Sequence, residues 1–163
     1  MTSRPEVLLT MPARPEGVGV VRQALAGMAD ALDFEASVLA DMKMAVTEAC
    51  TNVVVHAYDA DSGVLEVEMS ATEAGLTIVV RDHGTGIQPR PAQSEPPALG
   101  LGLPLIAALS DAFELRGSAG RGTEVRMTFA YNRNSDPAER NPVTGGVGVD
   151  GRWEPDQGTP AGG

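Results

Sequence analysis

Hydrophobic and polar residues alternate along several short stretches of the chain, with the period expected of strands that bury one face. In one stretch, for example, Glu66 and Glu68 separate apolar neighbours. The alternation predicts a first strand near the N-terminus, a hairpin across Glu73–Gly75 and a closing hairpin around Ser118–Gly122. The apolar positions of these strands are Val7, Leu9 and Met11, then Leu65, Val67 and Met69, then Leu76, Ile78 and Val80, and finally Phe113, Leu115, Val125, Met127 and Phe129.

Two longer stretches repeat apolar residues at three- and four-residue steps, which places those residues on one face of a helix. The predicted helices cover about Glu16–Leu32 and about Glu35–Ala57, with Asp33 as the N-cap of the second. A third, shorter helix is predicted over Leu103–Leu109, where Pro104 is tolerated in the first turn. The apolar faces consist of Val18, Val21, Leu25, Met28 and Leu32 in the first helix and Val38, Met42, Ala45, Ala49 and Val53 in the second.

The predicted elements follow one another in the order β-α-α-β-β-loop-α-β-β. Strands with a single apolar face need one layer of helices, so the predicted fold is an α/β (α+β) two-layer sandwich. Its sheet is mostly antiparallel and mixed, with helices covering one face. The predicted domain spans residues 5–131. Residues 132–163 contain seven glycines and four prolines without an apolar period, so we expect a disordered tail there.

Composition and charge narrow the class of partner. The chain has 163 residues, of which 22 are acidic and 12 are basic, and its formal charge is −10. This charge repels a phosphate backbone and argues against nucleic-acid binding. The single cysteine, Cys50, cannot form an intramolecular disulfide, and one cysteine with two histidines does not give the usual zinc spacings. No apolar run suits a signal sequence or a membrane span. We therefore expect a cytoplasmic protein with no membrane partner.

Three segments place polar residues or glycine where the apolar period predicts neither. Glu48 and Asn52 lie four residues apart on one helical face, so they could share a ligand. Asp82 ends a strand, and Gly84 and Gly86 follow it in a turn that lets a backbone approach closely. The motif GLGL opens the third helix, where unpaired amide groups and the helix dipole favour an anion. Its residues are Gly100, Leu101, Gly102 and Leu103.

Each segment alone is also typical of ordinary structure: a solvated helix face, a turn or a packed helix start. Together, their order resembles the ATP-binding site of the gyrase/Hsp90/histidine-kinase/MutL superfamily, with ExxxN, DxGxG, a proline-rich loop, GLGL, and a Gly-Thr pair at Gly122 before the last strand. The resemblance covers about residues 7–130. Within the superfamily, the segment AVTEACTNVVVHAY looks like the first motif of the anti-sigma factor serine kinases of the RsbW type.

The resemblance implies a role for each motif residue. Asn52 would be a ligand of Mg²⁺, because an amide oxygen suits this hard cation. Glu48 is similar to the catalytic glutamate of the family, which orients or deprotonates the attacking hydroxyl. Asp82 would accept a hydrogen bond from the adenine amino group, with support from Thr123. Guanine presents an acceptor at that position, so ATP should bind better than GTP.

The glycine-rich segments would serve the rest of the nucleotide. Gly84 and Gly86 would make room for the base, and the amide groups of the GLGL motif (Gly100–Leu103) would contact the phosphates. The loop Gln88–Leu99 would close over them as a lid. This loop contains one basic residue, Arg90, and no lysine.

The resemblance implies an ATP-dependent serine/threonine protein kinase that binds a sigma factor and phosphorylates a STAS-type anti-sigma antagonist on serine. Proteins of this kind usually act as homodimers. Because the predicted lid lacks a lysine, an alternative stays open: an ATP-binding regulatory module without kinase turnover, which controls a protein partner by lid closure. A third possibility is a histidine-kinase-like catalytic half that acts in trans and leaves phosphohistidine on another protein.

The remaining polar residues near these motifs have more ordinary interpretations. Cys50 is expected to face the sheet as a small apolar residue, because no activating base is placed for it. His83 is expected to be an exposed turn residue, and Arg121 is expected to be solvated. His56 would either cap or pack the helix end or contact phosphate.

Overall fold

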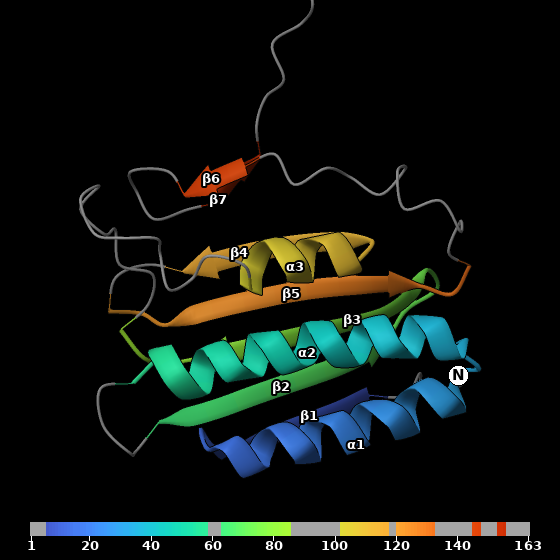
Figure 1. Cartoon of the computed structure of the whole chain (residues 1–163), viewed down its shortest axis with the longest axis horizontal. Helices are drawn as coiled ribbons and strands as arrows, with labels where there is room; N and C mark the ends of the chain where they lie inside the picture. Colours follow the sequence, from blue (N-terminus) through green and yellow to red (C-terminus); the bar gives the residue numbers. More distant parts are fainter. Residues whose placement is uncertain are drawn as a thin grey trace, which may run out of the picture.

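Five strands form one sheet, and three helices lie side by side on one of its faces (Figure 1). The computed structural model describes residues 6–58, 63–85, 102–117, 120–132, 145–147 and 153–155. The strands of the sheet are β1 (Glu6–Pro12), β2 (Val64–Ala71), β3 (Gly75–Asp82), β4 (Ala112–Gly117) and β5 (Thr123–Ala130). The helices are α1 (Pro15–Ala31), α2 (Ala36–His56) and α3 (Gly102–Leu109).

The strand order is β1-β2-β3-β5-β4, and each neighbouring pair is antiparallel. Two helices separate β1 from β2, so the chain returns to enter β2 in the opposite direction. The β2–β3 and β4–β5 pairs are the two predicted hairpins, with Ala71 opposite Leu76 and Gly117 opposite Thr123. The two-layer α+β fold is confirmed, and the sheet is antiparallel throughout rather than mixed.

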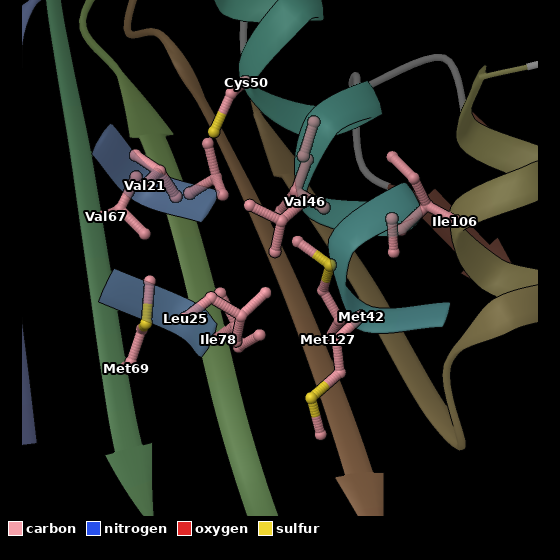
Figure 2. Close-up of a cluster of buried hydrophobic side chains, with 14 of the residues drawn as sticks. Val21, Leu25, Met42, Val46, Cys50, Val67, Met69, Ile78, Ile106 and Met127 are labelled. Atoms are coloured by element: carbon pink, nitrogen blue, oxygen red, sulfur yellow. The ribbon is translucent and has the colours of Figure 1, made fainter. Parts of the chain in front are cut away.

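The core lies between the helices and the sheet and is mainly aliphatic. Figure 2 shows side chains from α1, α2 and α3 meeting side chains from the strands. The inward positions of β2 and β3 are those predicted from the period of two, and Phe129 of β5 is also fully buried. Completely buried side chains include Val21, Leu25, Met42, Val46, Val67, Met69, Ile78, Ile106 and Met127.

Asp33 ends α1 and does not cap α2, so the predicted N-cap is wrong. Asp33 has a φ of 56°, in the left-handed region. Its N–H donates to the carbonyl of Asp30 at 3.2 Å, and the N–H of Phe34 donates to that of Ala29 at 3.0 Å. This pair of bonds is the Schellman pattern, in which aspartate replaces the usual glycine. The N-cap of α2 is instead Glu35, whose side chain makes no capping hydrogen bond.

Two short strands lie in the region for which a disordered tail is predicted. β6 (Gly145–Val147) and β7 (Trp153–Pro155) pair in antiparallel fashion, and β7 contacts β4. No periodic pattern predicts these strands. The rest of the predicted tail beyond Asn132 lies outside the described residues. In the part of the chain that the structure describes, no helix combines the length and apolar character needed to cross a membrane.

Candidate active site

Glu48 and Asn52 lie on the face of α2 that meets the start of α3. Both side chains are half-buried. A Cβ placed on Gly102, the first residue of α3, would lie 3.2 Å from Oε2 of Glu48 and 3.3 Å from Nδ2 of Asn52. The structure thus brings together the first predicted motif and the described part of the GLGL motif. We call these three residues the α2–α3 cluster.

Gly102 lets the start of α3 lie close to the side chains of Glu48 and Asn52. A Cβ at this position would be closer to both side chains than most Cβ contacts are, so they would have to shift. The first amide groups of a helix also lack partners within the helix, so they are available to a ligand. Leu103 is half-buried and packs against the core. Gly100 and Leu101 lie outside the described residues, as do Gly86 and the predicted lid Gln88–Leu99 with Arg90.

Asp82, the last residue of β3, is a buried charged residue with an exposed fraction of only 6%. Its Oδ1 accepts a hydrogen bond from the N–H of Gly84 at 2.9 Å. Thr123 stands directly opposite in β5 and donates to the carboxylate through its N–H and its hydroxyl. Burial raises the pKa of Asp82, and the hydrogen bonds from Gly84 and Thr123 oppose this rise. The predicted association of Asp82 with Thr123 is therefore present in the structure.

Two glycines beside Asp82 are required by close backbone approaches. A Cβ on Gly84 would lie 1.8 Å from the carbonyl oxygen of Ala57, the residue that caps the C-terminal end of α2. A Cβ on Gly122 would lie 2.0 Å from the carbonyl oxygen of Asp82, and Gly122 has a φ of 80°. We call the turn Asp82–Thr85 together with Gly122 and Thr123 the β3-turn cluster.

Arg81, the residue before Asp82, forms two ion pairs on the face of the sheet opposite the helices. Nη1 of Arg81 lies 2.9 Å from Oε2 of Glu68 in β2, and Nε lies 2.7 Å from Oε2 of Glu124 in β5. Because successive residues of a strand point to opposite faces, these ion pairs leave Asp82 on the helix side. They therefore hold β3 between its neighbours just where the β3-turn cluster begins.

The ordinary interpretations of several neighbouring residues agree with the structure. Cys50 is fully buried, and burial raises the pKa of its thiol to about 12, so it is not a nucleophile at neutral pH. His83 is exposed, and its Nε2 lies 3.2 Å from Oε1 of Glu66. Arg121 is exposed, as expected. His56, for which two interpretations were given, is an exposed residue at the end of α2.

The sequence interpretation missed two residues that contact the β3-turn cluster from the end of α2. The N–H of Thr85 donates to the carbonyl of Ala57 at 3.0 Å. The N–H of His83 donates to the hydroxyl of Tyr58 at 2.9 Å. Tyr58 is the last residue of the segment AVTEACTNVVVHAY, which carries the family resemblance. Its place in that segment was the one sequence signal that could have pointed to it.

The donor set of the α2–α3 cluster fits a hard cation. It offers the amide of Asn52 beside the carboxylate of Glu48, and oxygen donors of this kind suit Mg²⁺ in a site that is completed by substrate phosphates and water. Among the described residues, no group of three or more His, Cys, Asp or Glu side chains could form a separate all-protein metal site.

The sequence matches a known family over most of the described fold. Residues 11–129 match the family described as the histidine kinase-like ATPase domain. This range includes both residue clusters. The chain therefore belongs to the histidine kinase-like ATPase family.

Curated relatives narrow the class within that family. The chain is 31% identical over 151 residues to the serine-protein kinase RsbW of Bacillus mycoides (strain KBAB4). The match covers 85% of this chain and 93% of that relative. The chain is 38% identical over 135 residues to the RsbW of Bacillus licheniformis, with coverage of 75% and 83%. Its place among the RsbW-type kinases is thus shown, and its class of enzyme is serine/threonine protein kinase.

A solved structure supports the fold. The RsbU and RsbW domains of a Mycobacterium tuberculosis protein match with a TM-score of 0.63 and 24% identity. The match covers 80% of this chain and 33% of that chain. At this identity the likeness shows that the two-layer fold is shared.

Proposed function

We propose that this kinase binds a sigma factor and uses ATP, with Mg²⁺, to phosphorylate a STAS-type anti-sigma antagonist on serine. The observation that carries the proposal is the meeting of Glu48 and Asn52 at the first residue of α3. This arrangement offers a carboxylate, an amide oxygen and a helix N-terminus to the phosphate end of one nucleotide. The names of the RsbW relatives support the choice of a protein serine as the acceptor.

At the phosphate end, the chemistry follows from three kinds of group. The amides of Gly100, Leu101, Gly102 and Leu103 would hold the phosphates at the start of α3. The Asn52 amide oxygen would hold Mg²⁺, which when bound neutralises phosphate charge. Glu48 would accept the proton of the attacking serine hydroxyl, so that the oxygen can approach the γ-phosphate in line. The loop Gln88–Leu99 is proposed as the lid.

At the base end, Asp82 would accept a hydrogen bond from the adenine amino group. The N–H of Gly84 and both donors of Thr123 already orient its carboxylate in the free protein. Gly86 is proposed to leave room for the base. A guanine would present an oxygen to Asp82 and leave two acceptors facing one another, which disfavours GTP by roughly 1–3 kcal/mol.

The proposed partners are a sigma factor, a STAS-domain antagonist and a second copy of the chain. A formal charge of −10 favours a protein over nucleic acid as the macromolecular partner. The proposed location is the cytoplasm, where sigma factors act on transcription.

The test is affinity capture of the tagged protein from a lysate of its own organism, with Mg-ATP or Mg-ADP added. Mass spectrometry would identify the captured proteins and their phosphoserines. We expect a sigma factor among them, and a STAS protein that gains phosphoserine with Mg-ATP only. The Asn52→Ala variant should give no new phosphoserine. Confirmed ATP binding with neither partner recovered would contradict the proposal and favour a regulatory module without turnover.

A further inference from the structure

Tyr58 connects three segments that are distant in the sequence. It lies two residues beyond the last residue of α2, and its side chain is half-buried. Its hydroxyl donates to the carbonyl of Val64, the first residue of β2, at 2.6 Å. The same hydroxyl accepts a hydrogen bond from the N–H of His83, directly after Asp82, at 2.9 Å. One hydroxyl therefore links the end of α2 to the start of β2 and to the end of β3.

The ring of Tyr58 is held in place by Gly63. A Cβ on Gly63 would lie 1.9 Å from Cδ2 of Tyr58, so the ring occupies the space that a side chain would need. The ring also packs against the edge of the core. Since the ring position is fixed in this way, the position of the hydroxyl is fixed as well.

The contacts of Tyr58 and Ala57 tie the β3-turn cluster to α2. The N–H groups of His83 and Thr85 bond to Tyr58 and to Ala57, and Gly84 packs against the carbonyl of Ala57. The α2–α3 cluster takes Glu48 and Asn52 from the same helix. The distance between the two clusters therefore depends on these contacts at the end of α2.

We infer that Tyr58 is a positioning residue that sets Asp82 at the correct distance and orientation from Glu48 and Asn52, so that one adenine nucleotide contacts both clusters. The inference rests on the proposed function, because it assigns the base to Asp82. It adds a specificity determinant that lies outside the residues proposed to contact the nucleotide. The adenine contact needs a well-oriented carboxylate, whereas GTP gains little from Asp82 in any orientation.

The test compares the dissociation constants of Mg-ATP and Mg-GTP for wild type and Tyr58→Phe by calorimetry. Phenylalanine keeps the ring on Gly63 and removes the hydroxyl. We expect the Kd for ATP to rise about 5- to 10-fold, in line with a lost hydrogen bond, while the Kd for GTP stays within about twofold. The preference for ATP should fall accordingly. If Tyr58 contributes to stability alone, Tyr58→Phe would lower the melting temperature and leave the ratio of the two dissociation constants unchanged. That result would overturn the inference.

The other tyrosine provides a matched control. Tyr131 follows β5 and stacks on Phe34 with ring centroids 5.0 Å apart, near Ala74 and away from the β3-turn cluster. Tyr131→Phe should leave both dissociation constants unchanged. Gly63→Ala is a second variant, since it keeps the Tyr58 hydroxyl but displaces the ring. It should lower the ATP preference as well, and an unchanged preference in a folded Gly63→Ala protein would contradict the inference.

The wild-type measurement separates the two levels of the proposal. If wild type binds ATP no better than GTP, the assignment of Asp82 to the base fails. If wild type prefers ATP and Tyr58→Phe keeps the full preference, only the positioning role of Tyr58 fails.

Discussion

The β3-turn cluster and the α2–α3 cluster are built in different ways. In the β3-turn cluster the carboxylate of Asp82 is buried and accepts hydrogen bonds from Gly84 and Thr123, and the backbone at Gly122 leaves no room for a side chain. In the α2–α3 cluster the side chains of Glu48 and Asn52 are half-buried and lie close to the backbone of Gly102 at the start of α3.

Because of this difference, we expect the two clusters to control different properties of the protein. Groups that satisfy one another in the folded protein contribute to stability as well as to recognition. Half-buried polar groups beside the unpaired amides of a helix N-terminus contribute mainly when a ligand is bound. We therefore expect changes in the β3-turn cluster to alter stability and base recognition together, and changes in the α2–α3 cluster to alter phosphate chemistry alone.

The largest expected effect is on phosphotransfer in Glu48→Gln. The amide cannot accept the serine proton, so the rate should fall roughly 10²–10⁴-fold. The Kd for Mg-ATP and the free energy of unfolding should stay close to wild type. Radiolabel transfer to the captured antagonist measures the rate, and Glu35→Gln at the other end of α2 is the matched control. Equal rates for wild type and Glu48→Gln would show that Glu48 is not the base.

The next effect is on stability in Gly122→Ala. A left-handed φ and a Cβ placed 2.0 Å from the carbonyl oxygen of Asp82 should together cost roughly 2–4 kcal/mol in the free energy of unfolding. Urea unfolding measures this cost. The control is Gly27→Ala, where a Cβ meets open space on helix α1. It should instead stabilise the protein by up to about 1 kcal/mol. Similar effects from both substitutions would contradict the close approach.

A smaller effect is expected on nucleotide preference in Asp82→Asn. An amide can present its oxygen either to Gly84 and Thr123 or to the adenine amino group. The binding free energy of ATP should therefore weaken by about 1–3 kcal/mol, which raises its Kd. Competition between ATP and GTP in a fluorescent-nucleotide displacement assay measures the change. A variant that keeps the wild-type preference for ATP would remove Asp82 from the base contact.

The smallest effect is a pH dependence of stability that comes from Asp82. Its pKa is raised above the ordinary 3.8, so the folded state binds this proton more readily than the unfolded chain. This contribution is present below the ordinary pKa and is lost as pH rises through the folded value. Wild type should therefore lose stability relative to Asp82→Asn as the pH rises from the ordinary pKa of 3.8 through the raised pKa of the folded state. Urea unfolding of both proteins tests this, and a gap that moves in the opposite direction would contradict it.

The hydrophobic pattern was enough to predict the sheet and helices because each element has one buried face. It was not enough for positions whose conformation depends on distant contacts. Asp33 looks like an N-cap in the sequence, yet it adopts the left-handed conformation that ends α1. The period of two in β3 puts Asp82 on the same face as the buried Ile78 and Val80. The requirement for glycine at position 84, by contrast, comes from Ala57, 27 residues earlier in the chain.

The candidate site shows the same division. Spacing alone places Glu48 and Asn52 on one helical face. The support of Asp82 by Thr123 was predicted only from the family resemblance, and the register of β3 and β5 brings the two residues together. The hydroxyl of Tyr58 is different, because its partners are Val64, at the start of β2, and His83, directly after β3, which come together only in the folded protein. No periodicity in the sequence encodes such a contact.

The binding of one nucleotide across both clusters is tested most directly by a crystal structure of the protein with Mg²⁺ and a non-hydrolysable ATP analogue. We expect one nucleotide that spans both clusters, with its adenine amino group on the carboxylate of Asp82 and its phosphates at Gly102 beside Asn52. A nucleotide that contacts only one cluster, or that places its base away from Asp82, would contradict the account.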